Sequence, residues 1–146
     1  MKLFLDSSVL LAASGSASGA SRKIFRLAPH QSWTLIATPY VIEEVVGNLI
    51  NLPPAASADW VTLRRALEIN DDVLSLDRPA VFSPAKDRPI LFGALAWADV
   101  LLTLDKGDFA GLLGRSFYDL DVLRPGDFLR RERAEGRLTT EEIIAK

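Results

Sequence analysis

Short apolar runs along the chain alternate with longer segments whose apolar residues recur at helical spacing. Runs of three to five residues are typical of buried strands, and the longer segments of amphipathic helices. The predicted strands are Lys2–Leu5, Trp33–Ala37, Val73–Leu76, Val100–Thr103 and Asp121–Leu123. The predicted helices are Ser7–Ala13, Ala20–Leu27, Thr38–Ile50, Asp59–Ile69, Asp87–Ala98 and Pro125–Glu135, with a further turn at Thr139–Ala145. This alternation predicts an α/β fold, with a parallel sheet and helices on both of its faces.

Three of the predicted helices carry specific local signals. Thr38 and Pro39 offer an N-cap and a first helical position. The Asp59–Ile69 segment is amphipathic, because Trp60, Leu63 and Leu67 recur at helical spacing. The Asp87–Ala98 segment has the clearest apolar stripe, formed by Ile90, Leu91, Ala94, Leu95 and Ala98.

The composition excludes several classes of functional site. The 146 residues are 49% hydrophobic and 25% charged, and these values are typical of a globular protein. No apolar run approaches the ~18 residues that a membrane span requires, so we expect no membrane association. The chain has no cysteine and one histidine, His30, which excludes disulfides, zinc ribbons and a cysteine nucleophile. A metal ion would therefore be held by oxygen ligands, which suit Mg²⁺, Mn²⁺ or Ca²⁺.

The charge balance bears on partners and location. The formal net charge is −2, so the chain lacks the positive excess of a protein that binds nucleic acid through bulk charge. A nuclease is still compatible with this balance, because such an enzyme carries its own acidic pocket. From the composition we expect the protein to be cytoplasmic.

Acidic residues follow the apolar strands at their carboxyl ends. Asp6 comes directly after the first strand, and Asp105 follows the strand at 100–103. Asp87 opens the helix before that strand, and Glu43 or Glu44 lies on the helix after the second strand. In an open parallel sheet these ends face one ligand-binding edge. Carboxylates gathered there would raise one another's pKa unless cations lay among them, which is the setting for two-metal hydrolysis of a phosphodiester.

Each of these acids also has a purely structural interpretation. Asp87 could cap its helix and interact favourably with the helix dipole. Asp105 and Asp108 could be turn residues, and the two glutamates could be solvated. Asp6 is the hardest to explain in this way, because it directly follows an apolar strand.

Four segments in order resemble the successive motifs of the PIN-domain ribonucleases, a family that includes the VapC-type toxins. The segments are LFLDSSVLLA, TPYVIEEVVGNL, KDRPILFGALAWADVLLTLDKGDF and DVLRPGDFL. The resemblance extends from Met1 to about Arg130. It therefore divides the chain into a PIN-like nuclease domain over residues 1–130 and a polar helical tail over 131–146.

The resemblance implies a three-layer α/β/α sandwich and an endoribonuclease that uses Mg²⁺ or Mn²⁺ to cleave single-stranded RNA. It assigns catalytic and metal-binding roles to Asp6, Glu44, Asp87 and Asp105, with Glu43 as the alternative to Glu44. Three further residues match supporting positions of the family, and they are Ser8, Thr103 and Asp108. Ser8 and Thr103 would orient carboxylates, and Asp108 would act in support of Asp105 or replace it.

Two other functions and several partners are also compatible with these residues. The chain could be a non-catalytic PIN-like module that binds RNA or protein, or a metal-dependent receiver-like phosphotransfer domain. Membership of a toxin–antitoxin pair would add an antitoxin protein as a partner, and exposed apolar helices favour a homodimer.

Overall fold

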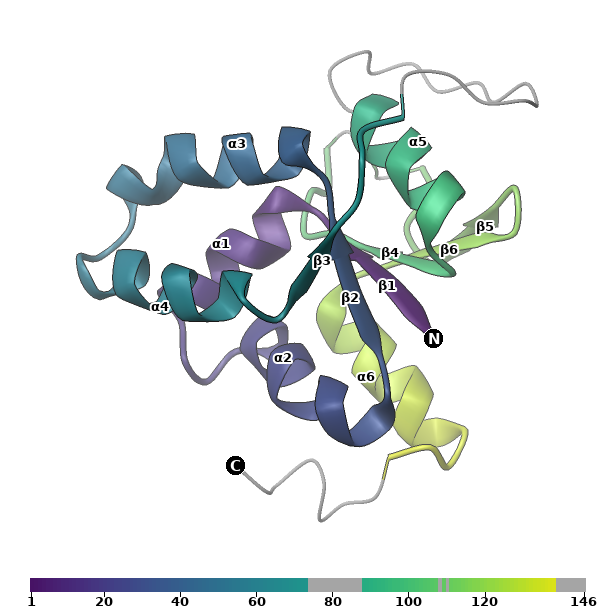
Figure 1. The fold of residues 1–146 in the computed structure, drawn as a ribbon. Helices are drawn as coiled ribbons and strands as arrows, with labels where there is room; N and C mark the ends of the chain where they lie inside the picture. The colour runs from purple at the N-terminus through teal and green to yellow at the C-terminus, as the bar shows by residue number, and fades with distance from the viewer. Residues whose placement is uncertain (74–87, 108, 110, 139–146) are drawn as a thin grey trace.

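Within the described residues, a six-stranded sheet forms the centre of the structure (Figure 1). The computed structural model describes residues 1–73, 88–107, 109 and 111–138. The strand order is β3-β2-β1-β4-β6-β5. The neighbouring strands pair in parallel except for β5, which is antiparallel to β6. The strands are β1 (Lys2–Leu5), β2 (Thr34–Ala37), β3 (Leu67–Ile69), β4 (Val100–Leu102), β5 (Arg115–Phe117) and β6 (Leu120–Leu123). The predicted α/β class is therefore confirmed.

Helices cover both faces of this sheet. Figure 1 shows α3 and α5 on one side, and α2 and α6 together on the other. The helices are α1 (Ser7–Gly15), α2 (Ala20–Gln31), α3 (Pro39–Asn48), α4 (Ala55–Arg64), α5 (Arg88–Trp97) and α6 (Pro125–Ala134), and a 3₁₀ turn, η1 (Leu49–Asn51), follows α3. This arrangement is the three-layer sandwich expected from the sequence.

The core is built on the two central strands. The side chains of Leu3, Phe4 and Leu5 on β1 are fully buried. On one face, α5 approaches closely because Gly93 has no side chain, and a Cβ there would lie 3.1 Å from the Phe4 ring. On the other face, the ring of Phe128 on α6 meets Trp33 edge-on at 5.0 Å. Burial on both faces explains why these strands are continuous apolar runs without polar alternation.

Two elements differ from the sequence prediction. The helix expected over Asp59–Ile69 ends at Arg64, and residues 67–69 form β3, which pairs in parallel with β2. Leu67 fits both periodicities, so the spacing alone did not distinguish helix from strand. The antiparallel strand β5 was not predicted, since its short sequence Arg-Ser-Phe has no apolar alternation.

Some predicted features lie outside the described residues. These are Asp87, Asp108, the turn at 139–145 and most of the strand expected at Val73–Leu76, of which Val73 alone is described and is not in a strand. Among the helices that the structure describes, none is long and apolar enough to cross a membrane.

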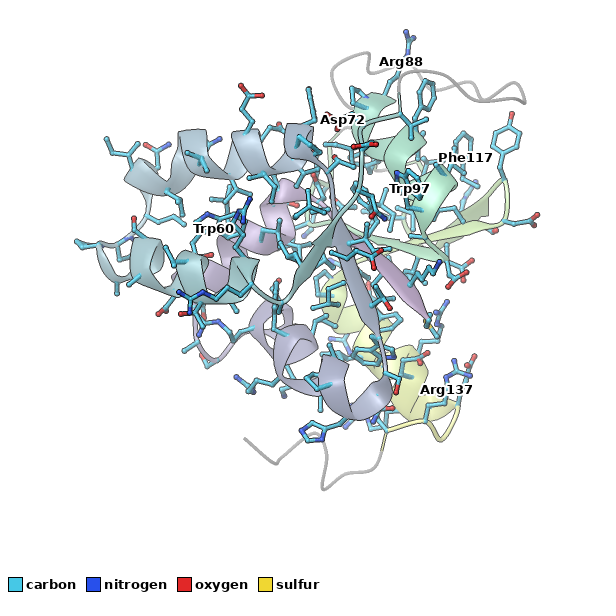
Figure 2. All side chains as sticks on the ribbon, in the orientation of Figure 1. Trp60, Asp72, Arg88, Trp97, Phe117 and Arg137 are labelled. Atoms are coloured by element: carbon cyan, nitrogen blue, oxygen red, sulfur yellow. The ribbon has the colours of Figure 1, made fainter. Side chains whose placement is uncertain are left out.

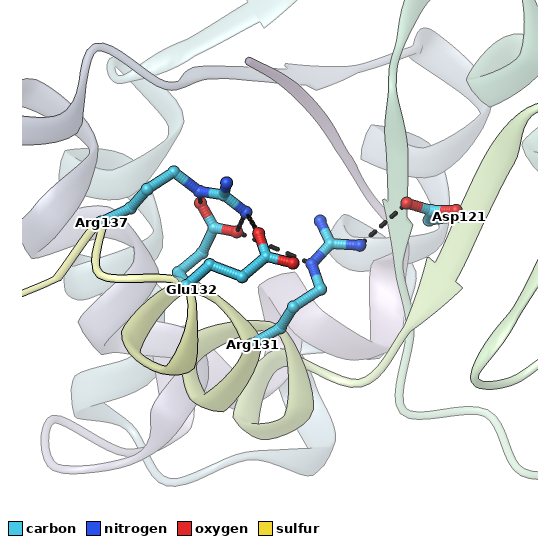
Figure 3. Close-up of polar contacts among 5 residues, drawn as sticks. Asp121, Arg131, Glu132 and Arg137 are labelled. Atoms are coloured by element: carbon cyan, nitrogen blue, oxygen red, sulfur yellow. Dashed lines mark hydrogen bonds and ion pairs between the residues drawn. The ribbon is translucent and has the colours of Figure 1, made fainter.

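A buried ion pair fixes the chain after α6 (Figure 3). Glu132 is 1% exposed, and its two carboxylate oxygens accept hydrogen bonds from Arg137 Nε and Nη2 at 2.8 and 2.6 Å. Arg137 also pairs with Glu135. On the other side, Arg131 lies 3.6 Å from Glu132 and bonds Asp121 on β6 at 2.8 Å. The end of α6 is thereby tied to both the sheet and the chain that follows.

Replacing Arg137 with alanine should therefore destabilise the protein. The change leaves a buried carboxylate with two hydrogen bonds fewer, and we expect the free energy of unfolding to fall by about 1–3 kcal/mol. Urea unfolding measures the loss. Arg133→Ala is the control, because Arg133 is exposed on the same helix and should change stability by less than about 0.5 kcal/mol. Equal effects from the two variants would show that the Glu132 pair adds nothing to stability.

Candidate metal centre

The carboxyl ends of three adjacent strands bring Asp6, Thr38 and Thr103 into one row. In the parallel register, Leu5 on β1 lies beside Leu102 on β4, so the next residues, Asp6 and Thr103, are neighbours. On the other side, Phe4 lies beside Ile36 of β2, and continuing that register by two residues places Thr38 beside Asp6. Side chains in register share one face of a sheet. The row is buried, with Asp6 3% exposed and both threonines 0%.

Asp6 accepts hydrogen bonds on both of its carboxylate oxygens. Oδ2 accepts from Thr103 Oγ1 at 2.7 Å and from Ser8 Oγ at 3.0 Å. Oδ1 accepts from the backbone N–H of Ser7 at 2.7 Å, because Asp6 is also the N-cap of α1. The start of α1 therefore holds the carboxylate in a single orientation at the sheet edge.

Ser8 and Thr103 also hold the loop that carries Asp105. The Thr103 hydroxyl accepts from Asp105 N at 3.0 Å, and Ser8 Oγ accepts from Leu104 N at 3.0 Å. Asp105 Oδ1 in turn accepts from Gly107 N at 2.9 Å, which closes a tight turn. The Thr103 hydroxyl thus connects the Asp6 carboxylate to the backbone of Asp105, and the Ser8 hydroxyl connects it to the backbone of Leu104.

Burial raises the pKa of the Asp6 carboxyl above its ordinary value of 3.8. The hydrogen bonds from Thr103, Ser8 and Ser7 oppose this rise, and the negative charge of Asp105 adds to it. In the described part of the chain, no lysine or arginine forms an ion pair with Asp6. A bound cation would stabilise the ionised form that burial disfavours.

The two adjacent glutamates of α3 differ in exposure. Glu43 is exposed, whereas Glu44 is half-buried and its Oε1 atom is inaccessible to solvent. The difference arises because Val41 and Val45 face the core and Glu44 lies beside that stripe. Of the two glutamates, Glu44 is therefore the one whose carboxylate is partly withdrawn from solvent.

The structure thus brings together part of the predicted site. Asp6, Asp105, Ser8 and Thr103 lie at one edge of the sheet, whereas Asp87 and Asp108 fall outside the described residues. Within the residues that the structure describes, no three His, Cys, Asp or Glu side chains gather closely enough to hold a metal ion. The donor chemistry of Asp6 and Asp105 nevertheless fits a hard divalent cation, since both offer carboxylate oxygen.

Sequence reasoning missed the place of Thr38 in this row, because it treated Thr38 only as a helix cap. A signal was present. When KLFLD, TLIAT and the segment ending VLLT are aligned as parallel strands, Asp6, Thr38 and Thr103 occupy equivalent positions.

Solved structures similar to this chain include the following two. VapBC2 from Rickettsia felis, bound to a DNA fragment from its promoter, matches with a TM-score of 0.59 and 14% identity, over 84% of this chain and 97% of that chain. PAE2754 from Pyrobaculum aerophilum matches with a TM-score of 0.59 and 15% identity, over 92% of this chain and 90% of that chain. No protein-family model matches the sequence. No curated protein matches it either.

The low identities restrict the comparison to the fold. Both structures align over most of their own length, so the similarity covers a complete domain. The resemblance first seen in the motifs is confirmed at that level: the chain has the fold of the PIN-domain proteins.

Proposed function

We propose that the protein is a metal-dependent endoribonuclease that hydrolyses phosphodiester bonds in single-stranded RNA. One observation carries the proposal. Asp6 is a buried carboxylate, oriented by two hydroxyls at the ligand-binding edge of the sheet, with Asp105 close enough to raise its pKa. Such a carboxylate is costly to keep ionised without a cation.

Asp6, Glu44, Asp87 and Asp105 are the proposed ligands of one or two Mg²⁺ or Mn²⁺ ions. A bound divalent ion lowers the pKa of water and stabilises charge on phosphate oxygens. The protein's own contribution is orientation. Thr103 and Ser8 fix the Asp6 carboxylate relative to the backbone of Asp105 and Leu104, respectively, so that the acids do not reorganise when substrate arrives.

The proposal extends to partners. The similarity to VapBC2 supports a role as the toxin of a toxin–antitoxin pair in the cytoplasm, with an antitoxin protein as partner. Apolar side chains exposed on α3, η1 and α4 support a homodimer, and they are Val46, Ile50 and Val61.

Metal-dependent cleavage is the test. Purified protein with Mn²⁺ or Mg²⁺ should cut an end-labelled single-stranded RNA, and excess EDTA should stop the reaction, because the mechanism depends on the ions. Ca²⁺ is a useful control, since it binds oxygen ligands but takes a looser geometry than Mg²⁺. Cleavage that continues in EDTA would exclude the proposed mechanism.

The same assay addresses the two alternative functions. RNA binding without cleavage in any divalent ion would identify a non-catalytic module. In a parallel incubation with acetyl phosphate, transfer of its phosphoryl group to an aspartate of the protein with release of acetate, and without RNA cleavage, would identify a receiver-like domain.

A further inference from the structure

The hydroxyl of Thr38 is a buried polar group with no hydrogen bond to any described residue. Thr38 is 0% exposed, and its Oγ1 atom neither donates nor accepts within the described part of the chain. A buried hydroxyl in this condition costs free energy, so its presence calls for an explanation.

Helix capping does not supply that explanation. Thr38 occupies the N-cap position of α3, but its side chain makes no capping bond. The acceptor that caps α3 is instead Asp72 Oδ1, which accepts a hydrogen bond from the backbone N–H of Tyr40 at 3.2 Å. Figure 2 shows Asp72 beside the start of α3. A carboxylate 32 residues further along the chain has therefore taken over the role usual for a threonine at this position.

Packing does not require the hydroxyl either. The methyl group of Thr38 faces α5, where a Cβ on Gly93 would lie 3.3 Å from Thr38 Cγ2. Valine has the same shape and would fill this contact equally well. The feature that valine lacks is the hydroxyl, and the row places Thr38 next to Asp6 on the side of β1 opposite Thr103.

We propose that Thr38 is a positioning residue of the acidic site, whose hydroxyl gains its hydrogen-bond partner when a divalent ion enters with its water. Thr103 donates a hydrogen bond directly to the Asp6 carboxylate at 2.7 Å. Thr38, in this proposal, forms its hydrogen bond only when the metal ion is bound. Mg²⁺ and Mn²⁺ retain water in protein sites, and a hydroxyl can donate to or accept from such water. This inference rests on the proposed function, because it assumes that the site binds these ions.

Thr38→Val tests the inference through metal binding in the absence of RNA. Titration with Mn²⁺, followed by electron paramagnetic resonance of the free ion, should show affinity weakened by about 10–100-fold, the usual effect of removing an outer hydrogen-bond partner. Thr38→Ser retains the hydroxyl and should bind like the wild type. Thr34→Val makes the same chemical change at the other end of β2 and should leave Mn²⁺ binding unchanged.

Thermal unfolding of the metal-free proteins in EDTA provides the second measurement. Because the hydroxyl has no described partner, Thr38→Val should leave the melting temperature unchanged or raise it. A lowered melting temperature would show that Thr38 is structural and would overturn the inference.

The two proposals fail in different ways. Wild-type protein that binds Mn²⁺ and cuts RNA, with Thr38→Val equal to it in both, would overturn the role of Thr38 alone. Wild-type protein that binds no Mn²⁺ and cuts no RNA would overturn the proposed function, and the role of Thr38 with it.

Discussion

Asp6→Asn should abolish metal-dependent cleavage while leaving the metal-free fold intact. Loss of partners that merely orient metal ligands costs about 10–100-fold, so loss of a charged ligand from the centre of the row should cost at least about 100-fold. Asparagine keeps an oxygen for the N–H of Ser7. Its amide group can donate to the hydroxyls of Thr103 and Ser8, which have lone pairs to spare. RNA cleavage rates in Mn²⁺ measure the loss.

The same variant should change how stability depends on pH. Burial and Asp105 raise the pKa of Asp6 in the folded protein above its unfolded value. The contribution of Asp6 to the free energy of unfolding is therefore fully present at pH values below its pKa in the unfolded chain. It is lost as the pH rises through its pKa in the folded protein. Asparagine does not titrate, so the stability of Asp6→Asn relative to wild type should increase across that window and then level off.

Melting temperatures of both proteins in EDTA, from about pH 3.5 to neutral pH, measure this difference. Parallel curves would contradict the raised pKa. A variant that melts well below the wild type near neutral pH would show that the hydrogen bonds of the carboxylate outweigh the cost of burying its charge.

Glu44→Gln should lose most metal-dependent cleavage, whereas Glu43→Gln should change it little. Adjacent helical residues differ by about 100° in direction, so only one of the two can face the sheet edge. Glu44 has a carboxylate oxygen sealed from solvent, and Glu43 is exposed. We expect a loss of about 100-fold or more for Glu44→Gln, as for the removal of a ligand.

The Glu43→Gln variant is a matched control, because it makes the same chemical change one residue away on the same helix. Side-by-side cleavage assays in Mn²⁺ compare the two. An inactive Glu43→Gln with an active Glu44→Gln would move the assignment by one residue. Two active variants would remove α3 from the metal site.

The elements predicted correctly from the sequence are those whose identity depends on local pattern and burial. The strands β1 and β4 are apolar runs bounded by polar residues, and α5 has an uninterrupted apolar stripe. The prediction of a helix over residues 67–69, which form β3, was wrong because a three-residue strand is defined by the strand with which it pairs. Leu67 becomes part of a strand by pairing with Leu35, a contact that helical spacing does not report.

The candidate site divides in the same way. The positions of Asp6 and Asp105 at one edge of the sheet could be predicted because each follows its strand almost directly. The capping of α3 could not, since its acceptor is Asp72, far along the chain, and the local sequence already offered Thr38 for that purpose. Because Asp72 supplies the capping acceptor, the Thr38 hydroxyl stays buried without a hydrogen bond to any described residue, and Thr38 lies next to Asp6 in the row.

Among the strands that the structure describes, β3 and β5 lie at the two edges of the sheet, and each is three residues long. Either edge of this sheet therefore offers few backbone hydrogen bonds to a strand from another molecule. In addition, β3 carries the exposed Glu68 at its middle. Short, charged edges disfavour growth of a sheet from one molecule to the next. Association of this protein with itself or with another chain should therefore proceed through helix side chains, and the sheet should remain closed to strand addition and to the aggregation that begins there.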